Sequence, residues 1–322
     1  MLHPTFIIAI KEVRDIMRSH IFLAILALLM ALTITSLFVS ELVFRDQLVQ
    51  YSSSLELLKS IGKSPIGDVP QFYPLNLLRG VVDYIEIIGA ILGIFLGYIT
   101  VFKEKNTKAI KLLLTRPITP KDIMLGKIFG NFIFIFGTIS LITILIFFTL
   151  PAVGGVWLSG IETVKLVMFI FISSFYILIF FMLSLWLSLS QKNIINALII
   201  AFSVWLLFVL IFPQMGDTMD PDNQVPGGFF KSMTLDHDQG LRVMEHFRYY
   251  EMIRTGVEYI SVTKHYERSL FALFGIKHSF NDQALGSILI SQWGNIFSIF
   301  AIPFLGMLAN MRFFQKNQEI LE

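Results

Sequence analysis

The sequence predicts an all-α membrane protein that crosses the bilayer six times, and its composition and hydropathy pattern lead to this fold class. The 322 residues are 55% hydrophobic and 15% charged, whereas a soluble domain averages about 25% charged residues. Six segments are apolar over roughly 20 residues, which is the helix length that crosses a hydrocarbon core about 30 Å thick. These segments are Ile21–Ser40, Tyr84–Phe102, Ile128–Val153, Val164–Leu189, Ile194–Phe212 and Leu285–Met311. We expect each to be a helix within a single transmembrane domain, residues 1–322, because backbone polar groups in lipid must be satisfied within the segment.

Residues 1–20 precede the first apolar segment and are predicted to form an amphipathic helix. Apolar side chains recur there at helical spacing: Phe6, Ile10, Val13 and Met17. The basic residues lie elsewhere around the helix: Lys11, Arg14 and Arg18. This pattern favours a helix that lies on the cytoplasmic leaflet of the bilayer. The alternative is a helix that packs on a soluble partner.

The distribution of Lys and Arg predicts the orientation of the chain, because cytoplasmic segments are enriched in these residues. With the N-terminus inside, the inner segments carry thirteen basic residues against six acidic ones. The outer segments then carry twelve basic residues against seventeen acidic ones. We therefore expect a multi-pass protein of the cell membrane with both termini in the cytoplasm.

Two outer connections are long. Residues 41–83 begin with a continued helical pattern, so the first span is expected to extend beyond the bilayer before the Gly and Pro residues after position 61 end it. Residues 213–284 are predicted to form a small helical extracytoplasmic segment between the fifth and sixth spans. Its helix is indicated by apolar residues three or four apart between Val243 and Ile260.

The inner loop of residues 103–127 contains the stretch "LLLTRPITPKDIMLGK" at 112–127. Thr119 is a good N-cap residue and Pro120 suits the first helical position. Asp122 follows where a carboxylate favours the helix dipole and approaches a capping-box geometry. Pro117 discourages helix at Arg116. The loop is thus expected to be a stiff, basic turn from which a helix starts sharply at Thr119, although a positive-inside anchor with a well-made turn explains the same residues.

Two intramembrane patterns remain. Gly89, Gly93 and Gly97 form a small-xxx-small stripe, which permits close packing of helices. The second pattern is a polar stripe in the last span, made of Ser291, Asn295 and Ser298 with Gln292 beside it. It is a candidate polar pathway, and hydrogen bonding between helices is the equal alternative.

Several kinds of chemistry are not indicated by the residues. The chain has no cysteine, which excludes thiol catalysis and zinc–thiolate sites. The Gly-Lys pairs at 62–63 and 126–127 lack the earlier glycine of a P-loop, so we expect no ATP hydrolysis, no catalytic residue and no cofactor in this chain. His237 and His246 match no metal template, so no metal site is predicted. A net charge of +2 gives no reason to expect nucleic-acid binding.

The 103–127 loop resembles the cytoplasmic loop of ABC-2 type transporter permeases. Members commonly show a Glu, a Gly-Thr, leucines, a Ser/Thr-x-Pro-Ile/Val turn and a Gly-Lys that opens the next span. The matching residues here are Glu104, Leu112–Leu114, Thr115, Pro117, Ile118, Gly126 and Lys127, with Asn106-Thr107-Lys108 where Gly-Thr is usual. The N-terminal helix resembles the family's connecting, or elbow, helix, with Glu12 and Arg18 matching. Within the family the chain resembles the permeases related to the nitrous-oxide-reductase maturation transporter.

The resemblance implies a homodimeric or pseudo-dimeric membrane unit that pairs with two cytosolic ABC ATPase subunits, which would hold the ATP and Mg²⁺. The 103–127 loop would dock on the ATPase through Glu104, Thr115, Pro117 and the turn that follows. That turn supplies Thr119, Pro120, Lys121, Asp122, Gly126 and Lys127. The resemblance makes an ATP-driven exporter the expected function. One alternative is a membrane subunit that relays force to an extracytoplasmic protein without moving solute, and another is a stand-alone membrane enzyme or receptor that uses residues 213–284.

Overall fold

The computed structural model describes residues 3–60, 73–107, 119–219, 243, 248–276, 280–281 and 283–316. Every regular element in these residues is a helix. The chain forms two compact units, each assembled from separate stretches of sequence. Unit 1 comprises Met1–Gly89, Gly126–Ser174 and Ser269–Trp293, and unit 2 comprises Ala90–Leu125, Phe175–Arg268 and Gly294–Glu322.

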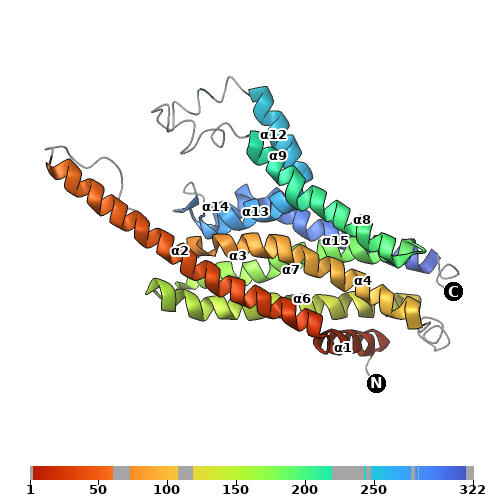
Figure 1. The fold of residues 1–322 in the computed structure, drawn as a ribbon. Helices are drawn as coiled ribbons and strands as arrows, with labels where there is room; N and C mark the ends of the chain where they lie inside the picture. The colour runs from red at the N-terminus through yellow and green to blue at the C-terminus, as the bar shows by residue number, and fades with distance from the viewer. Residues whose placement is uncertain are drawn as a thin grey trace. The chain divides into compact units, whose positions relative to one another are not determined.

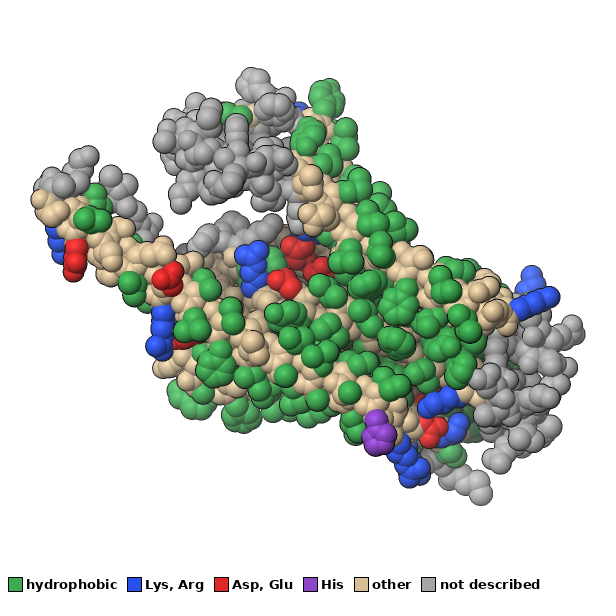
Figure 2. Space-filling view, viewed as in Figure 1, with side chains coloured by type: hydrophobic (Ala, Val, Ile, Leu, Met, Phe, Trp, Pro, Cys, Tyr) green, Lys and Arg blue, Asp and Glu red, His purple; other side chains and the backbone are tan. Residues whose placement is uncertain are grey.

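Six helical stretches in the described residues are long and apolar enough to cross a membrane, which confirms the predicted fold class. They are His20–Ser60, Pro74–Lys103, Pro120–Gly154, Gly160–Ser190, Ile194–Gly216 and Trp293–Lys316. On the face drawn in Figure 2, hydrophobic side chains cover much of the surface of these stretches. Such a surface is expected where the surrounding solvent is hydrocarbon.

Unit 1 begins with α1 (Pro4–Met17) and α2 (His20–Ser60). The second span follows as η1 (Pro74–Leu78), α3 (Arg79–Tyr84) and the π-helical η2 (Ile85–Gly89). Helix α2 packs on α3 and η1, where Gly80 lies directly against the Ser36 hydroxyl. The unit also holds α6 (Pro120–Gly154) from Gly126 onward, the first half of α7 (Gly160–Ser190) and α14 (Leu285–Ser291).

Helix α2 is much longer than a bilayer is thick. Its 41 residues correspond to roughly 60 Å at 1.5 Å per residue, against a hydrocarbon core of about 30 Å. Within α2, no side chain after Glu41 is buried. The second half of the helix therefore projects past η1 and α3 (Figure 1), in agreement with the helical pattern of the residues after position 40.

Unit 2 is built around a close contact between α4 (Ala90–Thr107) and the second half of α7. A Cβ atom on Gly93 would lie 2.5 Å from the Ile177 carbonyl oxygen, and one on Gly97 would lie 2.6 Å from the Phe181 carbonyl oxygen. The Ser184 hydroxyl donates a hydrogen bond to the Ile94 carbonyl across the same contact, at 2.7 Å. The two backbones therefore touch at these two glycines. Gly89, the third member of the stripe, lies in η2 of unit 1.

The fifth span of unit 2 consists of α8 (Ile194–Trp205), the π-helical η3 (Leu206–Ile211) and α9 (Phe212–Met219). Helix α12 (Arg248–Ile260) packs on α9, and α13 (Val262–Phe274) follows it. The Ser261 hydroxyl between α12 and α13 donates to the Phe208 carbonyl at 2.7 Å, satisfying an acceptor of the π-helical turn. Glu258 is buried and pairs with Arg254 and Arg268.

The last span differs from the predicted Leu285–Met311. It is divided into α14 (Leu285–Ser291) and α15 (Trp293–Lys316). Gln292 has φ −101° and ψ 8°, outside the helical region, and ends α14. The Ser291 hydroxyl bonds to the Ile288 carbonyl, a local bond that competes with helix continuation. The crossing helix therefore begins eight residues later than hydropathy alone predicted.

The glycine contact gives a test of the fold. Replacing Gly97 by Ala should lower the free energy of unfolding by about 1–3 kcal/mol, because the new methyl group would overlap the α7 backbone. Gly137→Ala in α6 is the matched control, since a Cβ there meets nothing within 4 Å. Thermal unfolding in detergent measures both variants. Equal stability of the two variants would contradict the packing described.

Candidate functional site

The start of α6 has the capped geometry that the sequence predicts. The Asp122 backbone N–H donates to the Thr119 hydroxyl at 3.2 Å, and that hydroxyl donates to the Asp122 carboxylate at 2.6 Å. The Ile123 N–H donates to the Thr119 carbonyl at 3.2 Å. Pro120 is the first residue of the helix. An N-cap of this kind contributes about 1 kcal/mol, so the helix starts at a defined residue, and Lys121 is exposed beside the cap.

Within unit 1, α6 is in backbone contact with α1. A Cβ atom on Gly126 would lie 2.6 Å from the Ile8 side chain, and one on Gly130 would lie 2.7 Å from the Ala9 carbonyl oxygen. The two glycines are one helical turn apart, on the same face of α6. Close approach of α1 therefore requires glycine at both positions.

A buried ion pair crosses this contact. Lys127 Nζ lies 3.3 Å from Glu12 Oε1, and the two side chains are only 4% and 10% exposed. The neighbouring Asn131 is fully buried, and its amide donates to the Lys127 carbonyl at 2.9 Å. Because a charge buried without its partner is strongly destabilising, the pair holds α1 and α6 in one register.

Helix α1 presents three different faces. Thr5, Ala9, Glu12 and Ile16 form the buried face. The exposed apolar side chains are Phe6, Ile7, Ile10 and Met17. The exposed basic side chains are Lys11, Arg14 and Arg18. The helix is thus packed on its own chain along one side and retains the apolar and basic surfaces of an interfacial helix.

The remaining candidate residues do not form one site. Thr115 and Pro117 lie outside the described residues, as do His237 and His246, and Glu104 is described only as part of the α4 backbone. The polar stripe of the last span is split: Ser291 ends α14 and Gln292 forms the break. On α15, Ser298 is partly exposed and its hydroxyl donates to the Gly294 carbonyl. Asn295 is buried, and its Oδ1 lies 2.7 Å from His265 Nδ1.

Sequence reasoning missed the partner of Lys127. It assigned Glu12 and Lys127 to separate elements, an elbow helix and a loop, and did not pair them. Two signals were available: Gly126 and Gly130 form a small-xxx-small pair, and Thr5 and Ala9 place small side chains on α1 at the same spacing. Together they indicate two helices that touch where the charges lie.

The fold and this site define a polytopic helical membrane protein in which α6 has a capped start and, further along the same helix, is clamped to the N-terminal helix. The family model of ABC-2 family transporter proteins matches residues 6–317. The chain therefore belongs to the ABC-2 transporter family, and it is a membrane-spanning ABC transporter subunit of the kind that works with an ATPase partner. No curated protein sequence matches it significantly.

The ion pair gives a second prediction. Glu12→Gln should lower the free energy of unfolding by about 3–5 kcal/mol, because it removes the Glu12 carboxylate from the buried Lys127 ammonium. The reversed pair, Glu12→Lys with Lys127→Glu, should recover much of that loss. Apparent melting temperatures of the detergent-solubilised variants provide the measurement.

Lys11→Met is the matched control for this experiment. It breaks the exposed pair between Lys11 and Asp15, whose charged atoms are 3.9 Å apart, and should cost less than about 1 kcal/mol. A Glu12→Gln variant as stable as Lys11→Met would show that the buried pair does not hold α1 on α6.

Proposed function

We propose that the chain is the permease subunit of an ATP-driven exporter, coupled to separate cytosolic ATPase subunits through the 103–127 loop. The observation that carries this proposal is the capped start of α6 followed, on the same helix, by the clamp on α1. A helix with a fixed first turn can transmit a push along its axis, whereas a frayed end would absorb it.

In the proposed mechanism this chain performs no chemistry on ATP. Two ATPase subunits bind ATP and Mg²⁺ and close on each other, and each presses on a 103–127 loop of a permease dimer. Lys121 and Asp122, at the first turn of α6, are the contact residues that we favour. The push moves α6 and, through Lys127 and Glu12, moves α1 with it. The N- and C-termini lie on the ATPase side, and cargo leaves on the opposite side.

The coupling site is tested by measuring how much ABC ATPase is recovered when the chain is purified from cells. Lys121→Glu should lower recovery of the ATPase roughly tenfold, or about 1.4 kcal/mol of binding free energy, because it reverses an exposed charge at the contact. Glutamate at this position suits the helix dipole, so the helix start stays intact. Deletion of 104–122 should abolish recovery altogether.

Lys192→Glu is the matched control, since Lys192 is another exposed lysine expected on the same side of the membrane. It should leave ATPase recovery unchanged. Undiminished ATPase binding after deletion of 104–122 would rule out the proposed coupling site.

A second candidate function is the relay of force to an extracytoplasmic protein. One observation in its favour is the length of α2, which exceeds the thickness of a bilayer. Another is the exposure of apolar side chains on α12: Tyr249 is 82% exposed, and Met252 and Ile253 are exposed as well. A photoreactive amino acid at Tyr249 distinguishes the two functions. Capture of an outer protein without solute flux in vesicles favours force relay, whereas flux without such capture favours export.

A further inference from the structure

The exposed side of α1 carries two rows of side chains that differ in chemistry. The apolar stripe repeats at steps of three or four residues and consists of Phe6, Ile10, Val13 and Met17. Phe6 is 61% exposed, and Ile10 and Met17 are each 50% exposed. The basic stripe has the same spacing and consists of Lys11, Arg14 and Arg18, all of them exposed. Because residues three or four apart are neighbours on a helix, each stripe is a continuous row.

The contact with α6 fixes how the two stripes are turned. On the buried face of α1, Ala9 lies against Gly130 and Glu12 pairs with Lys127. At 3.6 residues per turn, the apolar stripe lies about 100° round the helix from this face, and the basic stripe lies about 100° further round. Rotation of α1 would separate Glu12 from Lys127. The two stripes are therefore presented side by side in one orientation.

The basic stripe has a net positive charge. Lys11 faces one carboxylate, that of Asp15, and their charged atoms are 3.9 Å apart. Glu12, the other acidic residue of α1, is buried and paired with Lys127. Arg14 and Arg18 form no ion pair with the residues that the structure describes. The stripe thus presents two guanidinium groups one helical turn apart, and guanidinium is the side-chain group best suited to bidentate pairing with phosphate.

The position of α1 in the chain suits the headgroup region of a bilayer. The first span, α2, begins at His20, three residues after α1 ends at Met17 (Figure 1). An apolar stripe beside the start of a span can enter the acyl region, while long basic side chains extend toward the phosphates. A water-soluble partner that bound the basic stripe alone would leave Phe6 and Ile10 in water. The two stripes together therefore favour lipid as the occupant.

We propose that the basic stripe of α1 selectively binds anionic phospholipid from the leaflet in which the helix lies. The lipid phosphates pair with Arg14 and Arg18, Lys11 adds positive charge, and the apolar stripe inserts among the acyl chains. Zwitterionic lipid binds less well, because its ammonium group offsets the charge of its phosphate. This inference does not rest on coupling to an ATPase, because lipid binding is a property of this chain alone.

The test uses the full chain in phosphatidylcholine nanodiscs that contain equal traces of two photoreactive lipids. One is a phosphatidylglycerol and the other a phosphatidylcholine, with the same diazirine-bearing acyl chain, so that they differ only in headgroup and in adduct mass. After photolysis, mass spectrometry compares their adducts on α1. Phosphatidylglycerol should label α1 at least about fivefold more, the order of effect expected for one basic residue at an anionic lipid. Salt at about 1 M, where the Debye length is about 3 Å, should lower this ratio.

Two triple variants separate the basic stripe from the overall charge of the chain. The first combines Lys11→Gln, Arg14→Gln and Arg18→Gln, which keeps helix-forming side chains, and it should bring the ratio close to one. The second is the matched control and removes the same charge from exposed residues outside α1, as Lys192→Gln, Arg312→Gln and Lys316→Gln. It should leave the ratio unchanged. Both lipids compete in one sample, so the ratio does not depend on how much protein is recovered.

Four results would overturn the proposal. The first is a ratio near one in the unchanged chain, and the second is a high ratio that persists without the basic stripe. The third is an equal fall in both triple variants, which would show that only the overall charge matters. The fourth is a loss of ATPase recovery from cells in the first triple variant while its lipid ratio is unchanged. In that case the basic stripe would be a contact for protein and not for lipid.

Discussion

The contact between α1 and α6 depends on bringing two opposite charges together out of water. Glu12 and Lys127 are both buried, and each would cost several kcal/mol if it were buried alone. Their pairing is possible only because Gly126 and Gly130 let the α1 backbone approach α6. The charge pair and the glycines therefore support each other, and together they make an N-terminal helix and the third span a single mechanical piece. This rigidity is what an ATP-driven push on the start of α6 requires in the proposed mechanism.

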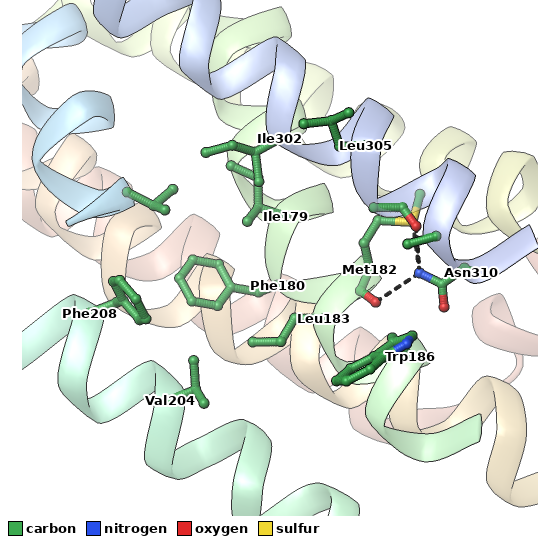
Figure 3. A pocket seen from close by; sticks show the side chains of 13 residues that line it. Ile179, Phe180, Met182, Leu183, Trp186, Val204, Phe208, Ile302, Leu305 and Asn310 are labelled. Carbon is green, nitrogen blue, oxygen red and sulfur yellow. Dashed lines mark hydrogen bonds between the residues drawn. The ribbon is translucent and has the colours of Figure 1, made fainter. Parts of the chain in front are cut away.

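Glycine contacts recur in unit 2, where α4 and α7 meet at Gly93 and Gly97. Because lipid tails are as apolar as leucine, helices in a bilayer gain little from hiding apolar side chains, and close backbone packing with a few hydrogen bonds must hold them. Ser184 of α7 donates such a bond to α4, and Asn310 of α15 donates one to α7. A cavity of unit 2 lies between α7, α15 and the fifth span (Figure 3). The glycine contacts and this cavity thus occur on different faces of α7.

The fold could be predicted from the sequence because hydropathy determines how many helices cross a bilayer. The capped start at Thr119 could be predicted because it depends on only five consecutive residues. Contacts between distant segments could not be predicted in the same way. The pairing of Glu12 with Lys127 depends on which face of α1 meets α6, and apolar periodicity marked instead the exposed face with Phe6 and Ile10. The break at Gln292 was missed because the polar residues around it were interpreted as one face of a continuous helix, whereas the structure ends α14 there.

In the proposed mechanism, α1 and α6 move as one piece when the ATPase partner binds ATP. The chain has no native cysteine, so cysteines at Lys11 on α1 and Phe129 on α6, both exposed, can carry spin labels specifically. Electron paramagnetic resonance would compare the distance between the labels without nucleotide and with ATP trapped. We expect one narrow distance distribution, unchanged by ATP, that broadens in the Glu12→Gln variant. A distance that shifts with ATP while Glu12 and Lys127 are intact would contradict it.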